Sequence, residues 1–173
     1  VYKRQALIFF FVELCLLRRA PQDLRASSGL LGLVAVADLL VGLLLGLIVG
    51  LPLWTSFAQG LVDIALPLAL LYAALSAVKR LPRFQQTATA LLGSGALLGV
   101  LAVVPLSLLP SGEQVQQSAL AAFLFLALIV WSILVTGHIL RHCFDLRLGQ
   151  GVVLAVAYNL LSYWLVSGLF SGS

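Results

Sequence analysis

Charged residues are scarce in this chain of 173 residues, because Asp, Glu, Lys and Arg together make up 9% of it. A soluble domain carries about 25% charged and about 45–50% apolar residues, whereas this chain is 62% apolar. So few charges cannot cover a water-exposed surface of this size. The composition therefore excludes a soluble enzyme, a nucleic-acid-binding domain and a disordered protein, and it predicts an integral membrane protein.

Long polar segments and recognisable catalytic motifs are also missing. No polar stretch is long enough to build a domain outside the membrane, so we expect one membrane domain over residues 1–173. The G-x-S-x-G, H-E-x-x-H and Walker A patterns do not occur, and no serine or cysteine is arranged with a histidine and an acid as a triad. We therefore expect a protein that is not an enzyme and that binds no cofactor.

The apolar residues gather in five runs that are long enough to cross a bilayer. About 30 Å of hydrocarbon requires roughly 20 residues of α-helix. The runs are continuous rather than alternating, which favours helices over the strands of a membrane barrel. They cover about residues 30–51, 60–78, 87–109, 118–140 and 151–170. The short connections between them predict an all-α, up-down bundle of five transmembrane helices.

A shorter apolar run, Ala6–Leu17, precedes the first span. As a helix it would be only about 18 Å long, Glu13 interrupts it, and two arginines and Pro21 end it. We interpret residues 5–28 as an N-terminal interfacial helix followed by a cytoplasmic link. The alternatives are a short sixth span or the apolar core of a signal peptide, although no A-x-A cleavage motif follows the run.

All ten Lys and Arg residues fall on one side of the predicted bundle. Because positively charged loops stay in the cytoplasm, we expect the amino terminus inside the cell and the carboxyl terminus outside. The Leu-, Ala- and Arg-rich, Lys-poor composition is typical of a bacterial protein, so the expected location is the bacterial inner (plasma) membrane. The cations are dispersed over three segments and form no aromatic-lined groove, which argues against a nucleic-acid partner.

One acidic residue, Asp38, is predicted to lie deep in the membrane, roughly 12 Å from the cytoplasmic boundary of its span. Tyr72, Ser132 and Asn159 are expected at a comparable depth, and we predict that the four side chains form a buried polar cluster. Such a cluster either joins helices or binds a proton, a lipid headgroup or a small ligand. Asp63 is expected near the outer surface, where it reaches water or headgroups.

Small residues mark helix faces that allow another backbone to approach closely. A spacing of four places such residues on one face of a helix. The candidate packing residues are Gly42, Gly46 and Gly50 in the first span and Gly95 and Gly99 in the third. The pattern predicts either a close contact between the first and third spans or a homodimer through the first span.

His138, His142 and Cys143 end the fourth span. The two histidines share a helix face, as metal ligands can, but no acidic partner completes a set, so ordinary polar residues at a helix end are expected and no metal. Cys15 and Cys143 both fall on the cytoplasmic side. Because that compartment is reducing, we expect no structural disulfide between them.

Two parts of the sequence resemble the Yip1-like family of membrane proteins. Trp131–Arg141 (W-S-I-L-V-T-G-H-I-L-R), a short polar link and Gly149–Gly151 are similar to the end of these proteins, and Leu17–Leu24 (L-R-R-A-P-Q-D-L) is similar to their amino-terminal part. The resemblance implies five spans. It implies no catalytic residues. Eukaryotic members act in vesicle trafficking and bind small GTPases or partner membrane proteins, but their cytoplasmic extension is nearly absent here.

These observations predict a small, non-catalytic inner-membrane protein in contact with the lipid bilayer. It would act as an accessory, scaffold or lipid-organising subunit, associating with other membrane protein subunits or with copies of itself. The alternative is a minimal transporter or channel component that uses Asp38 in the polar cluster. A transporter usually has inverted repeats and helices broken at the midplane, whereas here only Pro67 interrupts a span near its centre.

Overall fold

A computed structural model describes residues 2–108 and 115–170, and every regular element in this part of the chain is helical. The helices follow in the order α1 (Tyr2–Cys15), η1 (Pro21–Asp23), α2 (Ser28–Ile48), α3 (Leu53–Ala77), η2 (Leu81–Arg83), α4 (Phe84–Ser107), α5 (Val115–Phe144) and α6 (Leu148–Phe170). Leu109, the predicted end of the third span, lies outside the described residues. The all-α class predicted from the sequence is confirmed.

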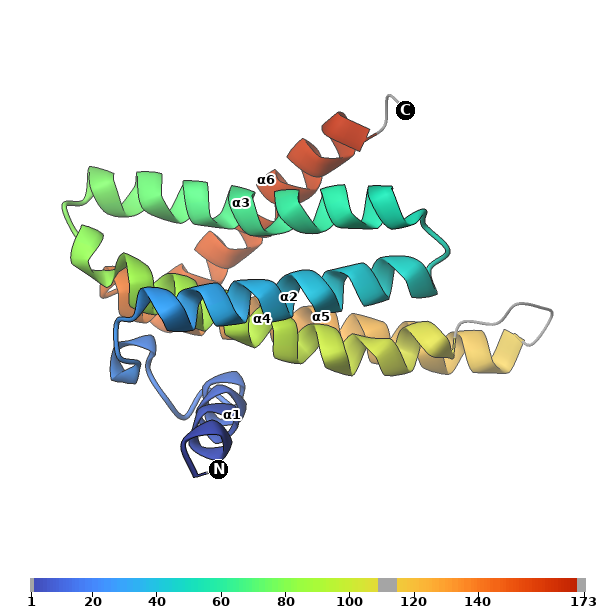
Figure 1. Cartoon of the computed structure of the whole chain (residues 1–173), viewed down its shortest axis with the longest axis horizontal. Helices are drawn as coiled ribbons and strands as arrows, with labels where there is room; N and C mark the ends of the chain where they lie inside the picture. Colours follow the sequence, from blue (N-terminus) through green and yellow to red (C-terminus); the bar gives the residue numbers. More distant parts are fainter. Residues whose placement is uncertain (1, 109–114, 171–173) are drawn as a thin grey trace.

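Four helices, α2 to α5, run back and forth along one common direction (Figure 1), and α4 packs against α2, α3 and α5. The described segments long and apolar enough to cross a membrane are Ser28–Ile48, Leu53–Ala77, Leu81–Ser107 and Ala119–Phe144. The chain is therefore a membrane-embedded helical protein. Buried residues are most frequent on α4, because α4 has neighbours on several sides.

Two helices, α3 and α5, are longer than the apolar runs suggested. α3 begins at Leu53 and not at residue 60, and α5 continues to Phe144 and not only to residue 140. Polar residues such as Ser56 and Gln59 belong to the first turns of α3, where groups close to the membrane surface are tolerated. The predicted start of the second span was therefore too late, which changes the depth of every residue on α3.

The helix α1 lies across the bundle near the start of α2 (Figure 1) and packs against α4. Phe10, Phe11 and Leu14 are buried against the bundle, while Ile8 and Phe9 on the other side are exposed. Trp131 of α5 donates a hydrogen bond from Nε1 to the carbonyl oxygen of the last residue of α1, at 2.7 Å. A short apolar helix before the first span is thus present, and it is fastened to the bundle.

The last helix, α6, runs at an angle to α2–α5 (Figure 1), and it crosses α5 closely at one point. At the crossing, a Cβ atom on Gly137 would lie 2.9 Å from the Cα atom of Val152, and a Cβ atom on Gly151 would collide with the carbonyl oxygen of Gly137. Two glycines therefore bring the backbones of α5 and α6 together. The rest of α6 contacts little of the bundle apart from α5.

Candidate functional site

Asp38 lies in the middle of α2, and its carboxyl group faces α4. A Cβ atom on Gly95 would lie 3.3 Å from Asp38 Oδ1, so the absence of a side chain at residue 95 makes room for the carboxyl group. One turn further, a Cβ atom on Gly99 would lie 2.6 Å from Cγ1 of Val41. The close contact between the first and third predicted spans is therefore present, with side chains of α2 lying against glycines of α4.

The glycines of α2 itself face α3. A Cβ atom on Gly42 would lie 4.0 Å from the Cα atom of Gly60, and one on Gly46 would lie 2.7 Å from Cβ of Ser56. Gly50 was expected on this packing face, but it ends α2 with a φ of 85° and has open space around its Cα atom. The N–H of the following residue donates to the carbonyl oxygen of Gly46 at 2.9 Å, as in a glycine-terminated helix.

A second carboxyl group, that of Asp63, lies close to Asp38, although we expected it near the outer surface. Because α3 begins at Leu53, Asp63 is well inside this helix of 25 residues. The antiparallel contact of Gly42 with Gly60 brings Asp63 level with Asp38, and the two carboxyl groups are close enough to interact electrostatically. Two ionisable groups at this depth are uncommon and point to function.

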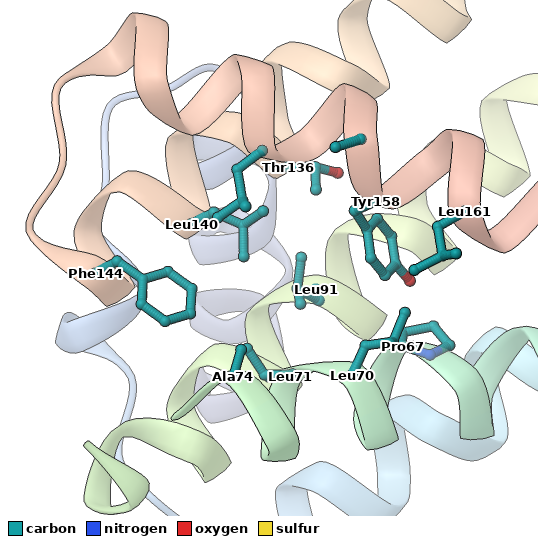
Figure 2. A pocket seen from close by; sticks show the side chains of 12 residues that line it. Pro67, Leu70, Leu71, Ala74, Leu91, Thr136, Leu140, Phe144, Tyr158 and Leu161 are labelled. Carbon is teal, nitrogen blue, oxygen red and sulfur yellow. The ribbon is translucent and has the colours of Figure 1, made fainter. Parts of the chain in front are cut away.

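Tyr158 of α6 is the third ionisable group in this region, and it interacts electrostatically with both carboxyl groups. Its half-buried side chain projects into the space between α3 and α6 (Figure 2). The predicted polar cluster contained the neighbouring Asn159 in place of Tyr158. A signal was available, because Gly151, Ala155 and Tyr158 follow the i, i+4, i+7 spacing of one helix face, and the first two are buried against the bundle.

The structure does not bring the other predicted members of the polar cluster to Asp38. The ring of Tyr72 packs edge-on against an aromatic ring of α4, with centroids 5.6 Å apart. The Ser132 hydroxyl donates to the carbonyl oxygen three residues earlier at 2.7 Å, and the Asn159 amide donates to the one four residues earlier at 2.8 Å. Residues expected at the same depth as Asp38 therefore do not all point toward it.

A groove of about 240 Å³ runs between α2 and α3 on the side away from the connection of α3 to α4. Ser56, Gln59 and Asp63 are its polar lining residues. The groove begins beside Leu51, at the connection between the two helices, and ends at Asp63. Polar groups along a groove give water molecules the partners that they need, so this groove offers access to Asp63 from one side.

The other end of the bundle carries the positive charge. We call this the basic end and define it by three segments: the α1–α2 linker, the α3–α4 connection, and the last turn of α5 with the α5–α6 connection. It holds Arg18, Arg19, Arg25, Lys79, Arg80, Arg83, Arg141 and Arg147. Hydrogen bonds and ion pairs of polar side chains join the three segments.

His138 fastens the α1–α2 linker to α5. Its Nε2 donates to the carbonyl oxygen of Arg19 at 2.8 Å, and its ring packs edge-on against that of His142. Cys143 Sγ lies 3.3 Å from the hydroxyl oxygen of Thr87 on α4. Among residues 2–108 and 115–170, no three His, Cys, Asp or Glu side chains are grouped as metal ligands. The contacts that are present join elements of the chain.

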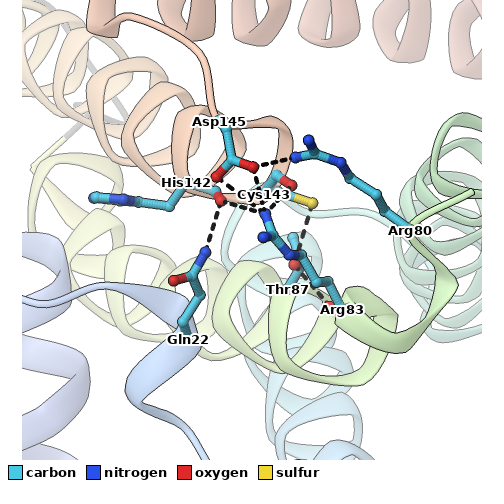
Figure 3. Close-up of polar contacts among 7 residues, drawn as sticks. All are labelled: Gln22, Arg80, Arg83, Thr87, His142, Cys143 and Asp145. Atoms are coloured by element: carbon cyan, nitrogen blue, oxygen red, sulfur yellow. Dashed lines mark hydrogen bonds and ion pairs between the residues drawn. The ribbon is translucent and has the colours of Figure 1, made fainter. Parts of the chain in front are cut away.

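Two arginines share the carboxyl group of Asp145, just after α5 (Figure 3). Arg83 Nη1 donates to Asp145 Oδ1 at 3.1 Å and to a carbonyl oxygen in the last turn of α5 at 3.0 Å, and Arg80 forms an ion pair with the same carboxyl group. These hydrogen bonds hold the pKa of Asp145 below its usual value. Gln22 adds a hydrogen bond of 2.9 Å to the carbonyl oxygen of His142.

Comparisons with known proteins provide no relative of this chain. No protein-family model matches the sequence, no curated protein matches it, and no solved structure matches the fold.

Proposed function

We propose that α6 is a fifth transmembrane helix and that the basic end faces the cytoplasm of a bacterium. The 23 residues of α6 correspond to roughly 34 Å of helix, which is enough to cross the hydrocarbon layer. Five spans place the two termini on opposite sides of the inner membrane. The positive-inside rule then assigns the amino terminus and α1 to the cytoplasmic side, with α1 at the interface.

Within this arrangement, we propose that the protein acts by association, as a non-catalytic accessory, scaffold or lipid-organising subunit. The observation that carries this proposal is the outer face of α6. Val153, Leu160 and Tyr163 lie on one stripe of this helix and are 69%, 65% and 76% exposed. Because α6 contacts mainly α5, the stripe is available to a helix of a partner membrane protein or of a second copy.

A photo-crosslinking amino acid at Leu160 tests this proposal in cells. We expect irradiation to give a covalent adduct of one defined mass, which identifies the partner. The same amino acid at Val36, an exposed residue of α2, is the matched control and is expected to give lipid adducts only. Equal protein adducts at both positions, or none at Leu160, would reject α6 as the association face.

We also propose that the chain is a Yip1-like protein. The two stretches that carry the resemblance contact each other, because His138 binds the backbone of Arg19 and Gln22 binds that of His142. Gly137 and Gly151, both inside the stretch nearer the carboxyl terminus, form the α5–α6 crossing.

A second candidate function is that of a minimal transporter or channel component. The observation that favours it is the neighbourhood of Asp38 and Asp63, next to a groove that begins at the end opposite the basic one. A carboxyl pair in a membrane is suited to carrying a proton or binding a cation. The pair also has a structural interpretation, in which shared protons and hydrogen bonds join α2 to α3.

Proteoliposomes separate the two interpretations of the carboxyl pair. Under a K⁺ diffusion potential, a transporter is expected to take up protons, and Asp38→Asn is expected to abolish the uptake while leaving the protein folded. Asp23→Asn, in the linker outside the spans, is the control. Uptake no faster than in empty liposomes, or uptake unchanged by Asp38→Asn, removes this candidate.

A further inference from the structure

A cavity of about 250 Å³ lies between α3 and α6, in the half of the bundle nearer the basic end. Pro67 and Ala74 of α3 form one side, Ala157 and Tyr158 of α6 form the other, and Leu91 of α4 and Leu140 of α5 form the floor (Figure 2). From Pro67 to Ala74 the cavity extends about 10 Å along the helices, at 1.5 Å per residue.

This cavity is lined by hydrocarbon. Only Thr136 and Tyr158, of twelve lining residues, carry a polar side-chain atom. A water molecule needs two to four polar partners, so water is a poor occupant, and an empty cavity forfeits the dispersion contacts of its walls. The occupant that fits the walls is therefore a hydrocarbon chain, and the surrounding bilayer supplies such chains.

The end of the cavity near the basic end is positively charged. Phe144 lines the cavity there, and the next residue, Asp145, carries one negative charge against the two positive charges of Arg80 and Arg83. The side chain of Arg80 is 37% exposed, and it uses only one of its nitrogens, Nη1, on the carboxyl group. Arginine binds phosphate groups through several N–H donors, so Arg80 retains donors for a phosphate.

We propose that this cavity binds an anionic glycerophospholipid, with one acyl chain between α3 and α6 and its phosphate at Arg80. The charge excess at the mouth selects the headgroup, and the apolar walls hold the chain. The phosphate lies at the level where the anionic headgroups of the cytoplasmic leaflet gather. The site uses the inner face of α6, so it does not depend on the proposed association through the outer face.

Native mass spectrometry of the full chain, released from nanodiscs with equal phosphatidylglycerol and phosphatidylcholine, tests the proposal. We expect one retained lipid per chain, with phosphatidylglycerol preferred. Arg80→Gln leaves one arginine against Asp145, so we expect the preference to fall about tenfold, the factor that corresponds to one charge-assisted hydrogen bond. Asp145→Asn doubles the net positive charge, so we expect the preference to rise. Arg18→Gln, in the linker, is the charge control and is expected to change nothing.

The acyl-chain part is tested by filling the cavity. Ala157→Leu places a larger side chain in the cavity and is expected to reduce retention of both lipids, whereas Ala122→Leu, on the exposed opposite end of α5, is not. Circular dichroism and thermal unfolding confirm that each variant is folded. Retention unchanged by both Ala157→Leu and Arg80→Gln would overturn the proposal. A second outcome would also overturn it: the parent protein is a dimer, and Ala157→Leu converts it to a monomer without changing lipid retention. That result would assign the cavity to a second copy of the chain.

Discussion

At the scale of single residues, Asp145 shows how a scarce charge acts in this protein. It is exposed and outside the spans, yet it joins the α3–α4 connection to the end of α5 through Arg80 and Arg83. Its pKa in the folded protein is below the value of about 3.9 expected in an unfolded chain. The ion pairs therefore stabilise the fold above about pH 4, and this stabilisation is lost as the pH falls through the lower, folded-state pKa.

This linkage predicts the acid behaviour of Asp145→Asn. We expect the variant to unfold at a lower temperature than the parent protein at pH 7. The difference shrinks below about pH 4, where Asp145 becomes protonated in the unfolded chain, and it is lost as the pH falls through the lower pKa of the folded protein. Thermal unfolding in detergent at a series of pH values measures it. A difference that stays constant down to the lowest pH would show that the ion pairs do not contribute.

The second residue-scale prediction concerns Cys15, in α1. Burial raises the pKa of its thiol to about 11, so only about one thiol in ten thousand is ionised at pH 7. Because the thiolate is the reactive form, we expect N-ethylmaleimide to label Cys15 slowly in the folded protein and rapidly after denaturation. Mass analysis of the α1 peptide measures this. Rapid labelling of the native protein would mean that α1 detaches from α4.

At the scale of helices, small residues determine which elements touch. The four-residue glycine spacing predicted packing faces, but it did not specify which helix covers each glycine. Gly42 and Gly46 lie against α3, Gly95 and Gly99 receive side chains of α2, and Gly50 ends its helix. A spacing identifies a face of a helix, and only the positions of the other helices determine what covers that face.

Two alanine substitutions within α2 test this difference. Gly46→Ala places a methyl group against Ser56, so we expect overpacking to destabilise the protein by about 1–3 kcal/mol. Gly32→Ala has no atom within 4 Å of the new methyl group, so we expect a gain of up to about 1 kcal/mol from helix propensity. Unfolding by a denaturing detergent compares the two, and equal effects would contradict the α2–α3 contact.

The start of α3 had the largest consequence of any helix boundary. Placing it at residue 60 put Asp63 near the surface, and the observed start at Leu53 puts it beside Asp38. The error arose because Ser56 and Gln59 look like connection residues in a hydropathy profile. The pairing of Gly42 and Gly46 with Gly60 and Ser56 contained the correct register, but it becomes visible only when two antiparallel helices are aligned.

At the scale of the whole molecule, we predict the sides of the membrane on which the termini lie. A carboxyl-terminal alkaline phosphatase fusion, which is active only outside the cytoplasm, is expected to be active in bacterial cells if α6 spans the membrane. A fusion after Arg83, in the α3–α4 connection, is expected to be inactive. An inactive carboxyl-terminal fusion would show that α6 does not cross, and an active fusion at Arg83 would reverse the orientation.

The sequence by itself determined that the chain is helical and membrane-embedded, because hydrocarbon leaves continuous apolar runs no alternative to the helix. It also predicted that the cations lie on one side, because they occur only before the first predicted span and at or beside alternate connections. Tertiary structure alone decided that Asp63 and Tyr158 accompany Asp38, that His138 holds a linker, and that α6 leaves a cavity beside two arginines. The depth of a residue follows from counting along one helix. Which residues become its neighbours depends on how each helix is rotated about its axis and on the angles at which the helices cross, and side-chain packing between helices sets both.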